Sequence, residues 1–396
     1  MDIGNHQALK LQARIKELEE ANSQLKTELA DFLKDPFTKY KSKDISPCNH
    51  TAEHIQEDIE GGRSVATCFV HCYYWCPKCV QAVHDWGENE IPNAHIGPKA
   101  RAQAAFLRYE IKISYDDIQR TLQYLCGLNI VPGSIAVFDN KLAQKAEPFY
   151  EELKQSLRKT SYICADETGW KRNWMWIFTN PEIAFFHIDE SRGSKVVVNH
   201  LGGFYNGILI TDFWNAYRNK VGAFAKQKCI VHLLRDIKEL LKIENIDEET
   251  KCFLLKVKTL FKDAIFIHHM HSIFSAAEYR SACKDIRQRF KKLRSNPNLE
   301  HHETDNIRKR LITFKDELLV FLKYPLVSPT NNFAEQGIRN AVLFRKITFG
   351  NMTKRGKRNV SIIMTIIRTA MLRKLNPLAI IQKILLNDIT AMPEAP

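Results

Sequence analysis

The 396-residue sequence lacks any run of about 18 consecutive apolar residues, the length that a membrane-spanning helix needs. Its most apolar stretch, residues 360–386, is interrupted by basic side chains. The N-terminus also lacks the basic start and apolar core of a signal peptide. Only ten cysteines occur, and in a chain without a signal peptide they are expected to be thiols or metal ligands, not disulfides. These absences predict a soluble protein of the cytoplasm.

Acidic residues are also in short supply. Lys and Arg total 58 against 45 Asp and Glu, which leaves a formal net charge of +13. Between Glu335 and Asp388 there is no acidic residue, although eleven Lys and Arg occur there. The apolar content of 44% is enough for the cores of two or three domains. This balance favours a polyanionic partner, nucleic acid before a membrane surface.

The first segment carries apolar residues at heptad spacing over residues 8–33, separated by good helix formers. This pattern predicts a coiled-coil dimerisation helix over residues 1–35, ended by Pro36. A lone Asn22 in one apolar column favours two-stranded pairing. The alternative is a single amphipathic helix that packs on the rest of the chain.

A cysteine-rich segment follows at residues 45–90. Cys76 and Cys79 form a CxxC pair, which commonly supplies half of a tetrahedral zinc site. Cys48 and His50 are the natural candidates for the other half, although their spacing is shorter than usual. We therefore expect a small zinc-finger-like module with one structural Zn²⁺. The alternative is a set of buried cysteines without metal.

Residues 95–155 have a helical pattern. Ser114 is a good N-cap for a helix to Leu125, and Gly127 lies in the turn before a second helix from Val131 to about Lys145. Two helices joined by a short turn with glycine are typical of a DNA-binding helix-turn-helix. The alternative is an ordinary helix pair that does not touch DNA.

Residues 161–232 are typical of an α/β core. A helix is expected over 194–201, and the expected strands cover 161–165, 174–179, 183–188, 207–211 and 227–231. The last strand leads into a helix through Leu241. A charged helical insert without a strand pattern is expected at about 243–325. The predicted architecture is a mixed sheet flanked by helices.

Three acidic residues stand out against this plan. Asp166 and Asp212 each end a short apolar run, and Glu335 lies just inside a predicted helix. Carboxylates from two strand ends and one helix can hold a pair of Mg²⁺ ions, which prefer oxygen ligands. Such a pair promotes phosphoryl transfer. The pattern therefore favours an enzyme that cuts or joins nucleic-acid strands.

Basic residues beside Glu335 are candidates for phosphate contacts. Residues 354–358 are expected to form a compact basic loop, and the helix at 360–372 is expected to pack on the sheet. The alternative for the basic residues is a solvated surface. The candidate DNA-binding residues are Arg339, Arg345, Lys346, Lys354, Arg355, Lys357 and Arg358.

Several motifs together resemble the transposases of the IS66 family of bacterial insertion sequences over roughly residues 65–385. They are residues 166–170 (DETGW), 211–217 (TDFWNAY), 229–236 (CIVHLLRD) and 329–335 (PTNNFAE). The resemblance implies an RNase H-like catalytic domain at 160–350, followed by a basic helical segment at 351–396. It also implies an Asp-Asp-Glu triad of Asp166, Asp212 and Glu335 with two Mg²⁺ or Mn²⁺ ions. Cys229 and His232 match a C-x-x-H step that is expected to shape the site.

The resemblance further implies metal-dependent cleavage and strand transfer at terminal inverted repeats. The implied partners are double-stranded DNA, a second copy of the chain in a homodimer or higher oligomer, and small accessory proteins. The implied place of action is the bacterial nucleoid. The sequence departs from the family at the first CxxC pair, which puts zinc binding in doubt. The alternatives are a metal-dependent nuclease or resolvase on the same fold, and a non-catalytic sequence-specific DNA-binding protein.

Overall fold

The computed structural model describes residues 46–77, 80–218, 220–244, 246–295, 301–350 and 353–395. These residues form two compact units. The first holds residues up to 54 and 70–86, and the second holds residues 55–69 and 87 onward. The expected coiled coil at 1–35 lies outside the described residues, so it stays a prediction.

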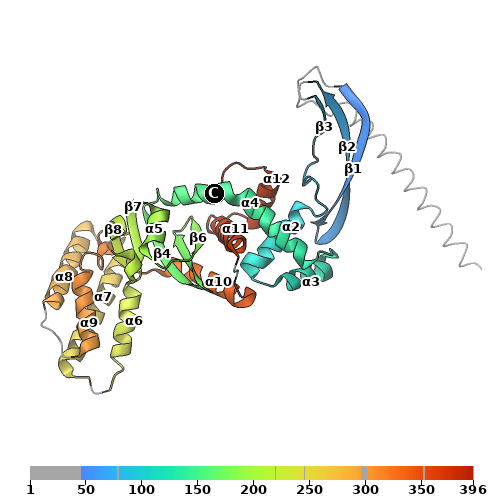
Figure 1. Cartoon of the computed structure of the whole chain (residues 1–396). Helices are drawn as coiled ribbons and strands as arrows, with labels where there is room; N and C mark the ends of the chain where they lie inside the picture. Colours follow the sequence, from blue (N-terminus) through green and yellow to red (C-terminus); the bar gives the residue numbers. More distant parts are fainter. Residues whose placement is uncertain are drawn as a thin grey trace, which may run out of the picture. The chain divides into compact units, whose positions relative to one another are not determined.

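The cysteine-rich segment forms a three-stranded sheet of β1 (Ser46–Glu60), β2 (Arg63–Cys76) and β3 (Gln81–Val83), seen in Figure 1. Gly61 and Gly62, with φ of 55° and 80°, make the turn between β1 and β2. A two-residue turn with positive φ at both positions matches the twist of a hairpin, and glycine adopts it without strain. Strands β2 and β3 pair antiparallel, with Cys76 opposite Gln81.

A helical region follows, and it has a small core of its own. It contains α2 (Pro98–Phe106), the π-helix η1 (Leu107–Ile111), α3 (Tyr115–Cys126) and the first turns of α4 (Pro132–Leu157). The Ser114 side chain accepts a hydrogen bond from the Asp117 N–H, and Gly127 ends α3 with φ 74°. The start of α3 is therefore as predicted and its end lies one residue beyond the predicted Leu125, because both caps are local.

The predicted end of the next helix at Lys145 is wrong, since α4 continues to Leu157 through Pro148. A proline inside a helix costs about 3 kcal/mol. Beyond Pro148, however, the helix buries four large side chains in the main core: Phe149, Tyr150, Leu153 and Leu157. Each contributes roughly 1.5–3 kcal/mol on burial, so the tertiary contacts outweigh the cost of the proline.

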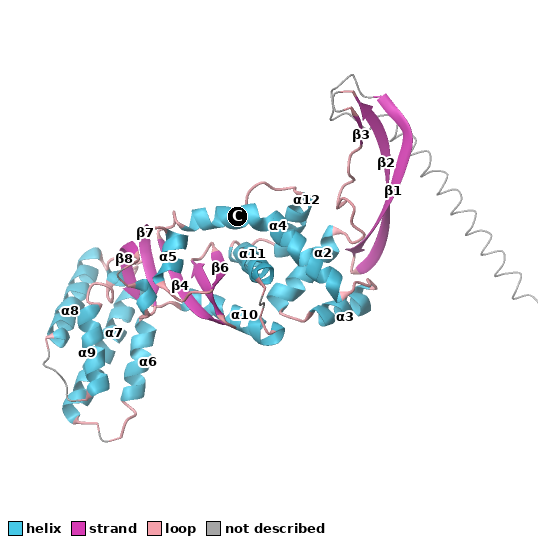
Figure 2. Cartoon of the chain, in the orientation of Figure 1, coloured by secondary structure: helices cyan, strands magenta, loops and turns pink. Residues whose placement is uncertain are grey.

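The centre of the second unit is a five-stranded mixed sheet with strand order β6-β5-β4-β7-β8 (Figure 2). Strands β4 (Tyr162–Trp170), β5 (Asn173–Thr179) and β6 (Ala184–Asp189) form an antiparallel meander. Strands β7 (Phe204–Thr211) and β8 (Gly222–Lys228) pair parallel to β4 and to each other. The chain is thus mixed α/β, as predicted.

Two helices connect these strands, α5 (Ser194–Leu201) and, after β8, α6 (Ile230–Leu240). The bounds of α5 are those predicted. The predicted strand at 227–231 overlaps β8 only at residues 227 and 228, since β8 begins at Gly222 and α6 starts after its N-cap Cys229. The reason is the helical spacing of Ile230, Leu233 and Ile237, all of which are buried. The short 3₁₀-helix η2 (Asn215–Tyr217) follows β7.

The expected insert consists of helices in its described residues. These are α7 (Glu248–His269), α8 (Ala276–Arg294), α9 (His302–Thr313) and the 3₁₀-helix η3 (Val320–Leu322). Ser275 and Glu278 form a capping box that starts α8. Figure 1 shows α6 to α9 grouped beside the β8 edge of the sheet.

The last helices are α10 (Asn332–Thr348), α11 (Lys354–Leu372) and α12 (Pro377–Leu386). Helix α11 covers the open edge of β6 with three hydroxyls at helical spacing. Ser361, Thr365 and Thr369 accept hydrogen bonds from the N–H groups of Ile188 (3.2 Å), Phe186 (2.9 Å) and Ala184 (3.2 Å), respectively. These bonds satisfy edge groups that would otherwise be unpaired. The expectation that the 360–372 helix packs on the sheet is confirmed.

The expected basic loop at 354–358 is wrong. Thr353 accepts a hydrogen bond from the Gly356 N–H at 3.0 Å and caps a helix that begins at Lys354. Threonine is a favoured N-cap, and the buried residues from Asn359 onward hold the helix against the sheet. The basic residues therefore occupy the first turns of α11.

Helix α10 approaches the sheet closely along a row of three small residues on its buried face, which also carries Ile338 and Phe344. Ala334, Gly337 and Ala341 are buried at helical spacing. A Cβ at Gly337 would lie 2.1 Å from Cδ1 of Ile177 on β5. Because glycine has no side chain at position 337, the Glu335 end of α10 can approach the sheet this closely.

We predict that Gly337→Ala lowers the free energy of unfolding by about 1–3 kcal/mol, because the new methyl overlaps Ile177. Ile177→Val deletes the clashing atom and alone costs about 0.5–1.5 kcal/mol. The double variant should cost less than the sum of the two single variants. Gly133→Ala is the control, since nothing lies within 4 Å of its Cβ position. Urea unfolding of all four variants measures these differences, and strict additivity would contradict the close approach.

Candidate active site

Asp166 and Asp212 lie at the same level on neighbouring parallel strands. The paired residues of β4 and β7 end with Cys164 opposite Ile210, and both aspartates lie two residues further along. Because side chains alternate along a strand, the two carboxylates lie on the same face as that pair. Asp166 is inside β4, since β4 continues as the partner of β5, whereas Asp212 directly follows β7. The expectation that Asp166 ends its strand is therefore corrected.

The electrostatics of Asp166 show how close the acids are to one another. Burial is the main cause that raises the pKa of Asp166 from 3.8 to about 7, followed by the charge of Glu167. The charges of Asp212 and Glu335 raise it further, and the Glu167 N–H, 2.9 Å from Oδ1, opposes the shift. In the described part of the chain, no Lys, Arg or His forms an ion pair with Asp166 or Asp212. The carboxylates of the two aspartates are thus not neutralised by a direct cationic partner, although the charge of buried Lys228 acts on Asp212.

Glu335 reaches this group from the first turn of α10, where the helix dipole favours a negative charge. Its Oε1 lies 3.4 Å from Nε2 of His232, and it is buried without a hydrogen-bond partner. Cys229, the N-cap of α6, is close to both residues. The structure therefore brings together Asp166, Asp212 and Glu335, and it also brings Cys229 and His232 to Glu335.

Asn331 ties the segments of the site together, although the sequence did not single it out. It is fully buried, and its Nδ2 donates to the Ala165 carbonyl at 2.9 Å, next to Asp166. Its backbone N–H donates to Sγ of Cys229 at 3.3 Å. As the N-cap of α10, it makes no side-chain capping bond of its own. The cap residue thus links α10 to β4 and to the start of α6.

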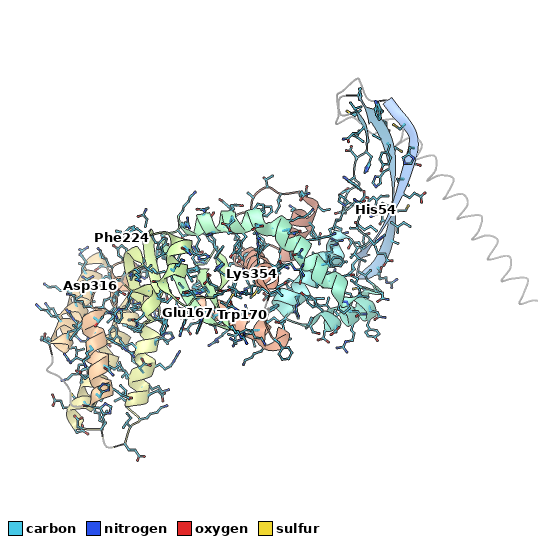
Figure 3. All side chains as sticks on the ribbon, viewed as in Figure 1. His54, Glu167, Trp170, Phe224, Asp316 and Lys354 are labelled. Atoms are coloured by element: carbon cyan, nitrogen blue, oxygen red, sulfur yellow. The ribbon has the colours of Figure 1, made fainter. Side chains whose placement is uncertain are left out.

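Glu167, which the sequence did not single out, belongs to a second network. Its side chain, labelled in Figure 3, is 1% exposed and pairs with Arg192 at 2.9 Å. The Tyr217 hydroxyl donates to it at 2.6 Å. The Arg192 guanidinium lies over the rings of Trp174 and Trp214. The backbone N–H of Trp214 donates to Asp212 Oδ1 at 2.9 Å, so this network holds the turn that carries Asp212.

Lys228 is a third residue that the sequence did not single out. It is fully buried at the end of β8, and its Nζ donates to the Asp212 carbonyl at 2.8 Å and to Thr211 Oγ1 at 3.0 Å. Burial lowers the pKa of Lys228 to about 8. The only hint in the sequence is a lysine inside a strand that leads into an apolar helix. It fixes the backbone on which Asp212 sits.

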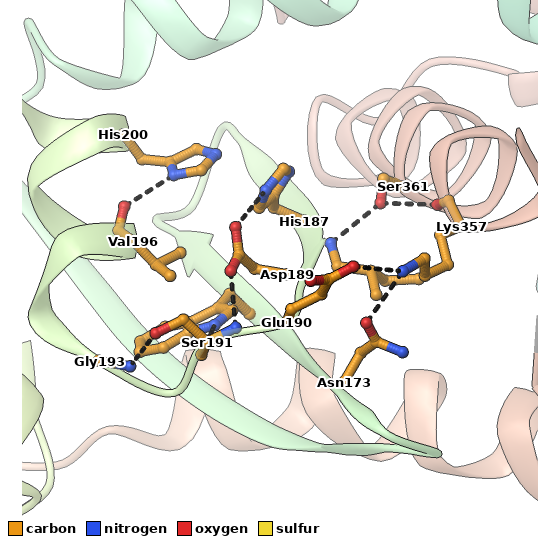
Figure 4. Close-up of polar contacts among 12 residues, drawn as sticks. Asn173, His187, Asp189, Glu190, Ser191, Gly193, Val196, His200, Lys357 and Ser361 are labelled. Atoms are coloured by element: carbon orange, nitrogen blue, oxygen red, sulfur yellow. Dashed lines mark hydrogen bonds and ion pairs between the residues drawn. The ribbon is translucent and has the colours of Figure 1, made fainter. Parts of the chain in front are cut away.

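The candidate DNA-binding residues divide into two sets. Arg345 donates to the Gly169 carbonyl, Arg358 pairs with Glu147, and Lys357 donates to Asn173 Oδ1 at 2.9 Å, with Glu190 at 3.7 Å. Figure 4 shows Lys357 directed to Asn173 and Glu190 at the β6 side of the sheet. The other four are exposed and have no ion pair within the described ranges: Arg339, Lys346, Lys354 and Arg355.

The candidate zinc ligands lie in the first unit. Cys48 and His50 are on β1, Cys76 ends β2, and Cys79 falls outside the described residues. The His50 ring lies 5.2 Å from the Tyr73 ring. Of the described cysteines, free thiols occur at Cys48, Cys68, Cys72, Cys126, Cys164, Cys229, Cys252 and Cys283. Among the described helices, none combines the length and the apolarity needed to cross a bilayer.

The protein is thus an α/β protein in which three carboxylates gather at one end of a mixed sheet. A model of the IS66 family of transposases matches residues 93–359, about two-thirds of the chain. The chain belongs to this family. The resemblance inferred from the motifs is confirmed.

A curated relative is an uncharacterized protein, y4jD, of Sinorhizobium fredii (strain NBRC 101917 / NGR234). It is 21% identical over 300 residues, which cover 64% of this chain. The match covers 55% of the relative, so the chain spans about half the length of this curated protein.

The raised pKa of Asp166 predicts a stability penalty in metal-free protein. Between pH 3.8 and about 7 the folded protein keeps a proton that the unfolded chain loses, so the free energy of unfolding falls as pH rises through this window. Asp166→Asn should therefore raise the melting temperature at pH 8 in EDTA. The corresponding gain in the free energy of unfolding is up to roughly 4 kcal/mol. The gain should vanish near pH 4. Mg²⁺ should stabilise the wild type but not the variant.

The control for this experiment is Asp189→Asn. A hydrogen bond with His187 holds the pKa of Asp189 below its ordinary value, so its charge stabilises the fold above pH 4. This variant should melt at or below the wild-type temperature at pH 8. A melting temperature of Asp166→Asn below that of the wild type in EDTA would contradict the charge crowding.

Asn331→Ala should destabilise the protein by roughly 1–3 kcal/mol, because it leaves the buried Ala165 carbonyl without a donor. Asn331→Asp should cost more, because a carboxylate oxygen would then face that carbonyl. Asn332→Ala, at the exposed neighbouring position, is the matched control and should be close to neutral. Urea unfolding separates the three variants. Equal costs at positions 331 and 332 would show that Asn331 does not hold the site together.

Proposed function

We propose that this protein is a DNA transposase in which Asp166, Asp212 and Glu335 form a metal-binding catalytic triad. The observation that carries the proposal is the matched level of Asp166 and Asp212 on adjacent parallel strands, with Glu335 close enough to raise the pKa of Asp166. The activity is cleavage of DNA at terminal inverted repeats and transfer of the freed strand to target DNA. Family membership supports the reaction class.

The strand order supports an RNase H-like assignment for this domain. Three antiparallel strands are followed by two parallel ones, in the order β6-β5-β4-β7-β8, with α10 against β4 and β5. In this arrangement the first strand of the meander and the first parallel strand lie side by side at the centre. Asp166 lies in β4 and Asp212 directly follows β7, and the helical insert of α7 to α9 precedes the helix of Glu335.

The site residues suit two divalent cations. All three are carboxylates, the hard oxygen ligands that Mg²⁺ and Mn²⁺ favour. Oε1 of Glu335 is buried without a hydrogen-bond partner, and burial and the neighbouring acids raise the pKa of Asp166 to about 7. A cation of charge two relieves both conditions. The residues that would hold it are Asp166, Asp212 and Glu335.

When bound, a pair of such ions activates the attacking oxygen and stabilises charge on the leaving oxygen of a phosphodiester. The protein's own residues position the triad. Lys228 holds the Asp212 carbonyl, Arg192 and Glu167 hold the following turn, and Asn331 joins α10 to β4. No side chain of the protein is required as a covalent nucleophile.

DNA would lie along the exposed basic residues near the triad. Arg339 is one turn beyond Glu335 on α10, and Lys346, Lys354 and Arg355 are exposed at the end of α10 and the start of α11. These cations neutralise phosphates and release counterions. Arg345, Lys357 and Arg358 already have partners within the protein, so they contribute to the fold of this face as well as to its charge.

The N-terminal parts complete the proposal. Residues 1–35 would pair two copies of the chain, and Cys48, His50, Cys76 and Cys79 would hold a structural Zn²⁺. Helices α3 and α4 would recognise the terminal repeats as a helix-turn-helix. The protein would act in the cytoplasm, at the nucleoid, with small accessory proteins of the same element.

The decisive experiment uses purified protein with labelled DNA that carries the ends flanking its gene, with Mg²⁺ or Mn²⁺. We predict metal-dependent nicking at the repeat boundary, lost in Asp212→Asn and Glu335→Gln, and joined products with target DNA. Asn332→Ala is the control for handling and folding. Nicking without joining would favour a nuclease or resolvase. Specific binding without cleavage, even with the companion proteins added, would favour a non-catalytic DNA-binding protein.

A further inference from the structure

Three different metal-donor groups meet beside the acid pair. Ligand atoms of Cys229, His232 and Glu335 all lie within 4.8 Å of one another. His232 Nε2 lies 3.4 Å from Glu335 Oε1. Cys229 is fully buried, and the other two residues are partly exposed. A thiol, an imidazole and a carboxylate thus converge at a point that solvent reaches from one side.

The backbone around this point is held in place. Cys229 is the N-cap of α6 and His232 lies in its first turn, whereas Glu335 lies in the first turn of α10. The Cys229 N–H donates to the Thr211 carbonyl at 2.8 Å, and the Ile230 N–H donates to the Pro329 carbonyl at 2.9 Å. Two helix N-termini therefore face the cluster, and both favour negative charge on a thiolate or a carboxylate.

The donor set differs in kind from the triad. Thiolate and imidazole ligands favour Zn²⁺ over Mg²⁺, which prefers oxygen ligands alone. Zn–N and Zn–O bonds of about 2.1 Å in a tetrahedron place the two ligand atoms about 3.4 Å apart. His232 Nε2 and Glu335 Oε1 already have this separation. The Asn331 N–H, which donates to Cys229 Sγ at 3.3 Å, orients the sulfur from the other side.

We propose that Cys229, His232 and Glu335 bind a zinc-type cation that occupies Oε1 of Glu335, an oxygen that the acid triad also needs. The three side chains supply three ligands, and solvent supplies the fourth. Glu335 cannot complete this site and the acid triad with the same oxygen. Zinc therefore acts as an inhibitor of the Mg²⁺-dependent reaction. The binding site stands on the geometry alone, whereas the inhibition rests on the proposed function.

Binding is tested with Co²⁺ as a spectroscopic substitute for zinc in the full-length protein. A thiolate bound to Co²⁺ gives a near-ultraviolet charge-transfer band, which excess Zn²⁺ removes. In Cys229→Ser and in His232→Asn, the intensity of the band should fall by the contribution of one bound Co²⁺. It should persist in Cys283→Ser, which removes a buried thiol of α8, and in Asp166→Asn. Cys76→Ser measures any contribution of the N-terminal cysteines separately.

Circular dichroism checks that each variant is folded. His232 is partly exposed, so His232→Asn tests the site even where Cys229→Ser does not fold. A wild-type protein without a thiolate band would overturn the proposal. So would a band of unchanged intensity in both Cys229→Ser and His232→Asn.

Inhibition is tested by adding Zn²⁺ to the Mg²⁺-dependent cleavage reaction, with each variant compared with its own rate in Mg²⁺ alone. The wild type should be inhibited and should recover when a zinc chelator is added. His232→Asn should need at least about tenfold more Zn²⁺ than the wild type for the same inhibition. Equal sensitivity of the two proteins would overturn the inhibitory role. If no cleavage occurs under any condition, the proposed function fails, and the Co²⁺ spectra still decide whether the site binds metal.

Discussion

The two hydrogen bonds of Asn331 are the contacts on which the candidate active site depends most directly. Through them, the start of α10 is fixed to β4 beside Asp166 and to Cys229 at the start of α6. Glu335 is in the next turn, so its position follows from these bonds. Because Asn331 is fully buried, neither bond competes with solvent, and loss of either leaves a polar group unpaired.

The rest of the domain supports this arrangement through close packing. Gly337 and its small neighbours let α10 lie against Ile177 on β5, and the hydroxyls of α11 satisfy the free edge of β6. Lys228 and the Glu167–Arg192 pair hold the backbone around Asp212 in place. These contacts keep three carboxylates together in spite of their mutual repulsion. This is the condition under which a site gains from binding divalent cations.

Sequence reasoning located the elements whose signals are local. Ser114 and Gly127 bound α3 through caps within one turn, and the limits of α5 were predicted in full. It failed where a distant contact decided the outcome. Helix α4 passes Pro148 because the main core buries its second half. The basic residues near position 354 are helical because Thr353 caps a helix that the β6 edge holds in place.

By itself, the sequence determined the family and the mixed α/β class and indicated three candidate acidic residues, because motifs, periodicity and residue type are carried by neighbouring positions. Only the tertiary structure decided that Asp166 and Asp212 lie level on adjacent strands and that Asn331, Lys228 and Arg192 support them. It also decided that Cys229 and His232 face Glu335. These relations join residues up to about 170 positions apart, and chain closure over such distances leaves no local pattern.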